Sequence, residues 1–154
     1  MMALDEIDRK LLYAVQRNAR LTAAEIGQAC GLSPTAALKR YKKLKSDGVI
    51  LGDVSIVEPE AVGLSVTMIV LVTLERERRD LIDAFKAAVR TEDRIMQGYA
   101  TTGDADFMLV ITARDVRDYE TFTQDFFYDQ HRVKNFKTLV VLDKIKLGMT
   151  VPLL

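Results

Sequence analysis

The sequence predicts an α+β protein in two folded parts, a helical part over residues 1–50 and an α+β part over residues 64–154, joined over residues 51–63 by an extended wing or linker strand. Three observations predict this division. Apolar residues before Gly48 repeat at helical spacing, β-branched residues dominate just after it, and strand-like and helix-like patterns alternate beyond Leu64. A chain of 154 residues is long enough for two small cores.

The first expected helix runs to about Asn18 and supports the two that follow. Asp5 lies at its N-terminal end, where a negative charge interacts favourably with the helix dipole. Its apolar positions repeat with helical spacing: Leu4, Ile7, Leu11, Leu12 and Val15.

A second helix is predicted from about Ala23 to Cys30. Thr22 and Glu25 have the spacing of a capping box, in which each side chain accepts a hydrogen bond from a backbone N–H at the helix start. Gly31 readily adopts the positive φ that ends a helix. Cys30, the only cysteine, lies at an apolar helix end, which favours a small core residue over a reactive thiol.

A third helix is predicted from Pro34 to about Asp47. Ser33 is a good N-cap, Pro34 is favoured at the first helical position, and Gly48 ends the helix. Only residues 31–33 separate it from the second helix. Two helices joined by so short a glycine-containing turn are typical of a helix-turn-helix, a DNA-binding motif.

The third helix is basic on the side that faces away from its apolar arc. Leu38, Tyr41 and Leu44, with Ala37 beside them, are expected to pack on the other helices. Arginine and lysine on the opposite side suit the major groove of double-stranded DNA, although a charged helix face can also be merely solvated. The predicted DNA-binding residues are Ser33, Thr35, Ala36, Lys39, Arg40, Lys42 and Lys43.

Charge and hydropathy narrow the class of protein. The formal net charge is zero, which argues against indiscriminate binding of polyanions, yet residues 1–58 carry +2 and the remainder −2. No apolar run is long enough for a membrane helix, and the start MMALDEIDRK is too polar for a signal peptide. A cytoplasmic protein is expected.

The second part is predicted to be a ferredoxin-like βαββαβ domain. Its elements follow from alternating or helical apolar spacing, and tight-turn residues Gly103 and Asp104 precede the third strand. The expected order is a strand over 65–75, a helix around 81–89, a strand over 95–102, a strand over 105–113, a helix opened by Asp115 or Arg117 and continuing to about Phe126, and a strand over 137–146.

The central strands are apolar on both faces. Val70 and Val72 alternate with Ile69 and Leu71, so helices covering one face leave an apolar second face. Self-association of this domain is therefore expected, most simply as a symmetric dimer.

Four sequence motifs together resemble the Lrp/AsnC, or feast/famine, family of transcription regulators. They are LDEIDRKLL, LTAAEIGQACGLSPTAALKRYKKLKSDGVI, EPEAVGL and TTGDADFMLVI, and the resemblance covers nearly the whole chain. It implies a DNA-binding protein that dimerises through its sheet-bearing domains and often forms tetramers or octamers. It also implies a small-molecule effector, commonly an amino acid, in a cleft between dimers lined by the loop from Thr102 to Asp106.

The chemistry of that loop suits an amino acid. Asp104 and Asp106 can accept hydrogen bonds from an α-ammonium group, and Gly103 permits close approach of the backbone, whose N–H groups can hold a carboxylate. A favoured tight turn with Asp106 capping the hairpin is the structural alternative. The predicted effector-binding residues are Tyr99, Thr101, Thr102, Gly103, Asp104 and Asp106.

This chain departs from the usual family pattern at several positions. Tyr41 replaces an aliphatic β-branched residue, and Asp53 stands where a tyrosine is frequent. The segment YDQHRVKNFKT, residues 128–138, lacks the usual Leu-Pro-Gly-Val-like turn beside the expected cleft. Its His131, the only histidine, is interpreted as a solvated loop residue rather than a ligand contact.

Enzymatic functions find little support. The sequence has no catalytic triad, phosphate-binding loop or paired metal ligands, and no cofactor or metal is expected. The alternative to an effector-responsive regulator is an architectural protein that wraps or bridges DNA without a small-molecule effector.

Overall fold

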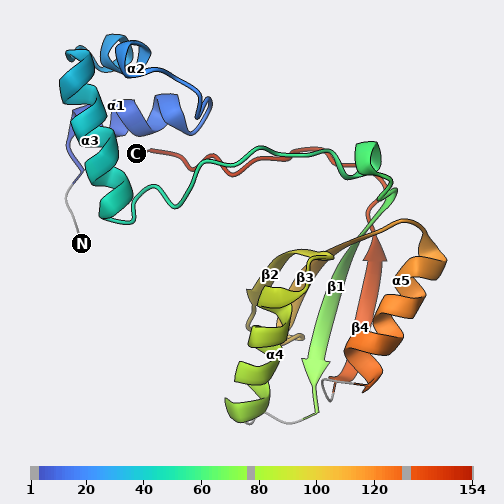
Figure 1. The fold of residues 1–154 in the computed structure, drawn as a ribbon. Coiled ribbons are helices and arrows are strands. Elements are labelled where there is room, and N and C mark those ends of the chain that lie inside the picture. The colour runs from blue at the N-terminus through green and yellow to red at the C-terminus, as the bar shows by residue number, and fades with distance from the viewer. Residues whose placement is uncertain (1–3, 76–78, 130–132, 154) are drawn as a thin grey trace. The chain divides into compact units, whose positions relative to one another are not determined.

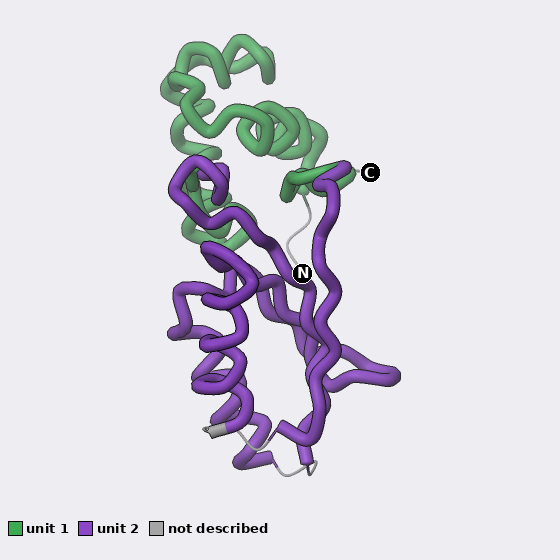
Figure 2. The backbone as a smooth tube through the Cα atoms, turned by 90° about the vertical axis from the view of Figure 1, so that its right-hand side faces the viewer, with its two compact units in different colours: residues 1–56, 146–154 green, residues 57–145 purple. Residues whose placement is uncertain are grey.

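A computed structural model of the chain describes residues 4–75, 79–129 and 133–153. The chain divides into two compact units (Figures 1 and 2). The helical unit comprises residues 1–56 and 146–154, and the sheet unit comprises residues 57–145. Each unit has its own hydrophobic core and is described separately below.

The helical unit contains α1 (Glu6–Val15), α2 (Ala23–Cys30) and α3 (Pro34–Ser46). The predicted capping box of α2 is confirmed: Thr22 Oγ1 accepts the Glu25 N–H at 3.3 Å, and Glu25 Oε2 accepts the Thr22 N–H at 2.7 Å. Gly31 ends α2 with φ 69°. Asp5 and Asp8 form a second capping box at the start of α1, where the sequence predicts only a favourable charge from Asp5.

The core of the helical unit lies between the three helices. Its buried members are Leu11, Leu12, Val15, Ile26, Cys30, Ala37 and Leu44, so Cys30 is the core residue that its position predicted. Burial raises the pKa of the Cys30 thiol. The expected place of Leu38 in this core was wrong, because α3 packs along the Ala37–Leu44 line and leaves Leu38 39% exposed.

The C-terminal segment, residues 146–154, belongs to the helical unit, whereas the sequence predicts it as part of the second domain. The Gln16 side chain binds both backbone groups of Val151: its Nε2 donates to the carbonyl at 3.1 Å, and its Oε1 accepts the N–H at 3.0 Å. Leu153 packs against the helical core. These contacts join residues 135 positions apart, so local sequence patterns cannot predict them.

The sheet unit has the ferredoxin-like order that the sequence predicted (Figure 1). Its four-stranded antiparallel sheet has the strand order β2-β3-β1-β4, and Asp115 caps α5 as expected. The elements are the 3₁₀ turn η1 (Pro59–Val62), β1 (Val66–Leu74), α4 (Arg79–Thr91), β2 (Ile95–Ala100), β3 (Phe107–Ala113), α5 (Val116–Thr123), the π-helical turn η2 (Gln124–Asp129) and β4 (Val133–Val140).

The core of the sheet unit fills the space between one sheet face and the helices α4 and α5. Alternate residues of β1, including Val70 and Val72, are fully buried there, as are Leu109 and Ile111 of β3. The five phenylalanines of this core are Phe85, Phe107, Phe122, Phe126 and Phe127. The opposite face carries half-buried Ile69 and Leu71 of β1 and Met108 and Val110 of β3, which the register aligns as neighbours.

The predicted range of the last strand, 137–146, was wrong. β4 begins at Val133, which pairs with Leu74, and ends at Val140. Pairing with β1 determines where the strand begins, since Leu74 is the last residue of β1, and the last paired residue, Val140, lies opposite Met68. Leu142 and Ile145, whose alternation had suggested a strand, are 95% and 92% exposed. None of the helices in the described part of the chain has the length and apolar content needed to cross a membrane.

Candidate functional site

The N-terminal half of α3 exposes the first group of predicted DNA-binding residues. Ser33 Oγ accepts the Ala36 N–H at 3.3 Å and so fixes the first turn of the helix. Thr35 is exposed and Ala36 is half-buried beside it. This end of the helix has a positive dipole and N–H groups suited to phosphate. The residues that fix the helix start therefore lie next to those predicted to contact DNA.

Lysines cover the outward face of the rest of α3. Lys39 and Lys42 are exposed and form no ion pair with any described residue. Lys43 pairs with Asp47 one turn later, its Nζ 2.5 Å from Oδ2, and keeps a side chain that is 65% exposed. Three cationic side chains thus remain accessible on one face of the helix.

Arg40 lies at the side of this face and is held by α1. Its Nη1 is 2.7 Å from Asp5 Oδ2 and 2.8 Å from Asp8 Oδ1, and these contacts raise the pKa of Arg40. The two carboxylates belong to the α1 capping box, so one arginine connects the start of α1 to α3. A guanidinium has five N–H donors, and these ion pairs leave Nη2 and Nε available. Arg40 is therefore a bridge between helices as well as a predicted DNA contact.

The loop between β2 and β3 is closed by its own hydrogen bonds. The Thr101 N–H donates to the Asp106 carbonyl at 2.9 Å, and Thr101 Oγ1 donates to the Ala105 carbonyl at 2.6 Å. Gly103 adopts φ 114°, a conformation unfavourable for other residues. Within the described residues, the backbone N–H groups of 102–105 donate to no other backbone group. They and the exposed carboxylate of Asp104 are available to a ligand.

Asp106 attaches this loop to the end of β1. Its backbone N–H donates to the Val72 carbonyl at 2.9 Å, and its Oδ2 accepts the Leu74 N–H at 2.8 Å. The sequence predicts the same role for Asp104 and Asp106, but the structure gives them different contacts. The Asp106 side chain accepts the Leu74 N–H at the end of β1. The Asp104 side chain forms no hydrogen bond or ion pair with a described residue. The motif GDxD thus contains one structural and one exposed acid.

The remaining predicted effector residues lie on β2 and just after it. Tyr99 is 47% exposed, lies opposite Met108 on the apolar sheet face, and donates its hydroxyl to Gln97 Oε1 at 3.2 Å. Thr102 is exposed. The predicted effector residues from Thr101 to Asp106 therefore belong to one loop. Tyr99 lies on the strand before that loop, on the apolar sheet face.

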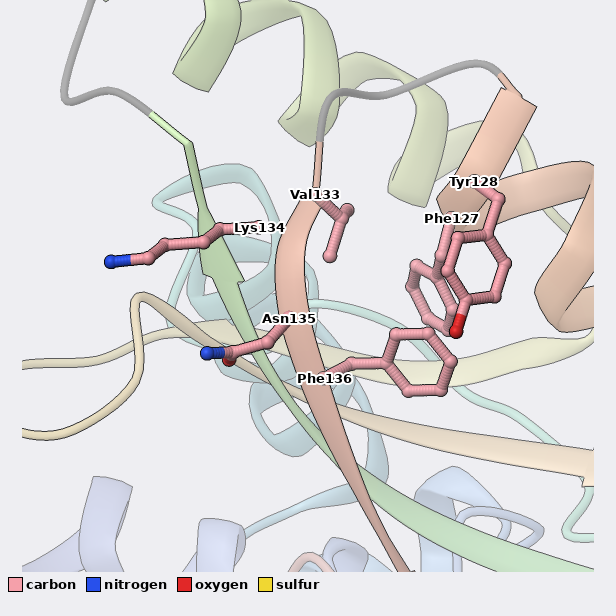
Figure 3. Close-up of a pocket in the computed structure, with 6 residues that line it drawn as sticks. All are labelled: Phe127, Tyr128, Val133, Lys134, Asn135 and Phe136. Atoms are coloured by element: carbon pink, nitrogen blue, oxygen red, sulfur yellow. The ribbon is translucent and has the colours of Figure 1, made fainter.

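A cavity of about 160 Å³ lies between the end of η2 and the start of β4 (Figure 3). Its aromatic wall consists of Phe127, Tyr128 and Phe136, while the side chains of Lys134 and Asn135 point away from that wall. Sequence reasoning identified this region only as a departure from the family pattern. His131 lies outside the described residues, so its assignment stays a prediction.

Two protein-family models match this chain, one in its helix-turn-helix part and one in its sheet-bearing part. The model of the AsnC-type helix-turn-helix domain matches residues 4–45, and that of the Lrp/AsnC ligand-binding domain matches residues 67–151. A relative described as an uncharacterised HTH-type transcriptional regulator of Sinorhizobium fredii is 55% identical, covering 99% of this chain and 90% of its own. The leucine-responsive regulatory protein of Haemophilus influenzae is 32% identical, with 94% and 87% covered.

A solved structure matches over nearly the whole chain. It is that of a transcriptional regulator of Neisseria meningitidis in complex with L-Met, 30% identical, with a TM-score of 0.91 and coverage of 98% of this chain and 97% of that one. The matched residues include both the helical unit and the sheet unit.

Proposed function

Because the chain belongs to the Lrp/AsnC family of transcriptional regulators, we propose that it binds specific double-stranded DNA sites as a homo-oligomer and that an amino acid modulates this binding. The observation that carries the DNA-binding part is the outward face of α3. Lys39, Lys42 and Lys43 are exposed on one side of a helix whose other side is packed by Ala37 and Leu44. Such a helix can enter the major groove, where lysine contacts guanine edges and phosphates.

Replacing Lys39, Lys42 and Lys43 with alanine tests this face. We expect DNA affinity to fall by roughly 10- to 1000-fold and the slope of log affinity against log salt to fall by about one for each lysine that contacts a phosphate. A matched variant replaces Lys86, Arg90 and Lys134 of the sheet unit with alanine, which removes the same charge. Equal losses in both variants, or unchanged binding in the first, would refute the assignment to α3.

The proposed effector site is the loop over residues 101–106. It presents the Asp104 carboxylate to an α-ammonium group and free backbone N–H groups to a carboxylate, while Asp106 and Thr101 hold the backbone in place. The solved relative bound to L-Met supports an amino acid as the ligand class. The apolar face beside Tyr99, with Leu71 and Met108, supports a second copy as its cover and a site at the resulting oligomer interface.

Two substitutions separate the roles of the two acids. Asp104→Asn removes the negative charge, so we expect it to abolish the response to amino acids. Asp106→Asn retains a side-chain oxygen that can accept the Leu74 N–H, so the loop and the response should persist. The measurement is DNA affinity and oligomer size with each common amino acid, after a thermal-shift screen of the wild type. The opposite pattern would assign the ammonium contact to Asp106.

An architectural DNA-binding protein is the alternative outcome. Such a protein would bind DNA through α3, yet its affinity and oligomer size would not change with any amino acid. An effector shifts assembly only if it binds one state more tightly than another. A wild type that responds to no amino acid in the screen would therefore remove the effector from the proposal and leave the DNA-binding part.

A further inference from the structure

We propose that Tyr41 and Asp53 form a clasp that shortens the free linker after the helix-turn-helix and thereby restricts the spacing of DNA half-sites that the oligomer accepts. This inference rests on the proposed DNA-binding function. The two residues are those at which the sequence departs from the family pattern in and after the third helix, and the structure brings their side chains into contact. The two departures are therefore one feature.

The chain returns along α3 before it enters the linker. Gly48 adopts φ 71°, and the N–H groups of Val49 and Ile50 both donate to the Leu44 carbonyl, at 2.9 and 3.2 Å. This turn brings Asp53 back to the side of the helix that carries Tyr41 and Lys45, which lie one turn apart. Among the described residues, those from 51 to 57 form no backbone hydrogen bond to one another or to the rest of the chain. Side chains alone hold this segment.

The contacts of Asp53 are short and involve both carboxylate oxygens. The Tyr41 hydroxyl lies 2.8 Å from Oδ1 and 2.9 Å from Oδ2, and Lys45 Nζ lies 2.5 Å from Oδ2. The Lys45 ammonium and then the Tyr41 hydroxyl lower the pKa of Asp53, so the carboxylate is charged at neutral pH. The Tyr41 ring is half-buried against the helical core, which limits the positions its hydroxyl can reach.

The clasp sets how many linker residues are free. The next attachment after Asp53 is Glu58, whose Oε1 lies 2.5 Å from Lys144 Nζ within the sheet unit. With the clasp closed, residues 54–57 are unattached; with it open, the last attachment is Ile50, and residues 51–57 are unattached. The boundary between the two units, at residues 56 and 57, falls inside this segment.

The C-terminal segment is the second connection between the units. It limits how much extra linker length an open clasp can provide. Its attachments are Lys144 and Val151, which leave residues 145–150 free. The closed linker, with four free residues, is shorter than this connection, whereas the open linker, with seven, is longer. Opening the clasp therefore adds about two residues of usable length, roughly 7 Å at the extension of a β-strand. That distance corresponds to about two base pairs along B-DNA.

Binding across a range of half-site spacings measures this length directly. A DNA site selected by the wild type from a random pool is resynthesised with its half-sites moved apart or together one base pair at a time. A linker that cannot span a site gives almost no bivalent binding, so the wild type should lose at least about tenfold in affinity at two base pairs from its optimum. Tyr41→Phe and Asp53→Ala should each reduce that loss to within about threefold. The affinity for a single isolated half-site should not change.

Three further variants separate the clasp from general effects. Asp53→Glu keeps a carboxylate and should retain the narrow spacing range, and Tyr13→Phe removes a hydroxyl from an exposed tyrosine of α1 and should have no effect. Gln16→Ala releases Val151 alone and should also leave the range narrow, because the linker stays short.

The outcomes distinguish this inference from the function on which it rests. Identical spacing ranges in the wild type, Tyr41→Phe and Asp53→Ala, with DNA binding intact, would overturn the clasp alone. A wild type that binds no DNA would overturn the proposed function together with the inference. A broader range in Tyr41→Phe and Asp53→Ala, with the range unchanged in Tyr13→Phe, would establish the clasp.

Discussion

The helical unit and the sheet unit are stabilised in different ways. The helical unit has a small aliphatic core, and its helices are fixed at their ends by side-chain caps and by the Arg40 bridge between α1 and α3. The sheet unit has five phenylalanines in one core, connected by ring contacts from Phe85 to Phe127. Burial of large side chains therefore dominates the stability of the sheet unit. Close backbone packing and polar helix ends contribute more to the stability of the helical unit.

The largest expected effect is the loss of an aromatic ring from the sheet unit. Phe127 is fully buried, and its ring lies 4.7 Å from Phe136 and 5.4 Å from Phe126. Phe127→Ala should lower the free energy of unfolding of this unit by about 3–5 kcal/mol, since it removes apolar burial and leaves a cavity. Hydrogen exchange resolved by peptide should show the loss in β1, β4 and α5.

The neighbouring aromatic residue provides the control. Tyr128 is 70% exposed, so Tyr128→Ala should change the stability of the sheet unit by no more than about 0.5 kcal/mol. Similar losses from both substitutions would mean that the aromatic core is not the dominant source of stability in the sheet unit.

A smaller effect is expected from the helical unit, where backbone packing is close. A Cβ atom at Gly27 would lie 2.6 Å from the Leu32 carbonyl oxygen, a backbone atom that cannot turn away. Gly27→Ala should destabilise the unit by about 1–2 kcal/mol, because the clash outweighs the better helix propensity of alanine. Gly52→Ala is the matched control, since a Cβ there meets nothing within 4 Å. Chemical denaturation followed by hydrogen exchange in α2 measures both, and a stabilised Gly27→Ala would contradict the clash.

The same contrast explains how far the sequence could predict the fold. The ends of α2 were predicted correctly because Thr22, Glu25 and Gly31 act within a few residues of the ends that they determine. The range of β4 was predicted wrongly because pairing with β1, more than fifty residues earlier, determines where the strand begins. Gly27 carried a signal, a glycine inside a helix, but its partner at Leu32 is visible only in the structure.

In the candidate site too, contacts between residues close in sequence could be predicted and those between distant residues could not. The basic face of α3 could be predicted because helical spacing alone places Lys39 and Lys43 on one side. That Arg40 bridges to Asp5, and that Asp106 binds the Leu74 N–H, could not be predicted, because both contacts join residues more than thirty positions apart. Residue type indicated the chemistry of each side chain, and the fold decided which of them were already occupied.

The smallest expected effect concerns Asp118, an acid of the sheet unit whose pKa is strongly lowered. Hydrogen bonds from the Arg114 side chain and backbone, both 3.0 Å long, lower the pKa of Asp118 from 3.8 to about 2. A lowered pKa means that the folded state favours the charged form, so this contribution is present above pH 3.8 and is lost as the pH falls towards 2. The start of α5 should therefore lose protection from hydrogen exchange between about pH 4 and pH 2. Asp118→Asn should remove that pH dependence while sparing the phenylalanine core, and an unchanged profile in this variant would mean that another acid controls the start of α5.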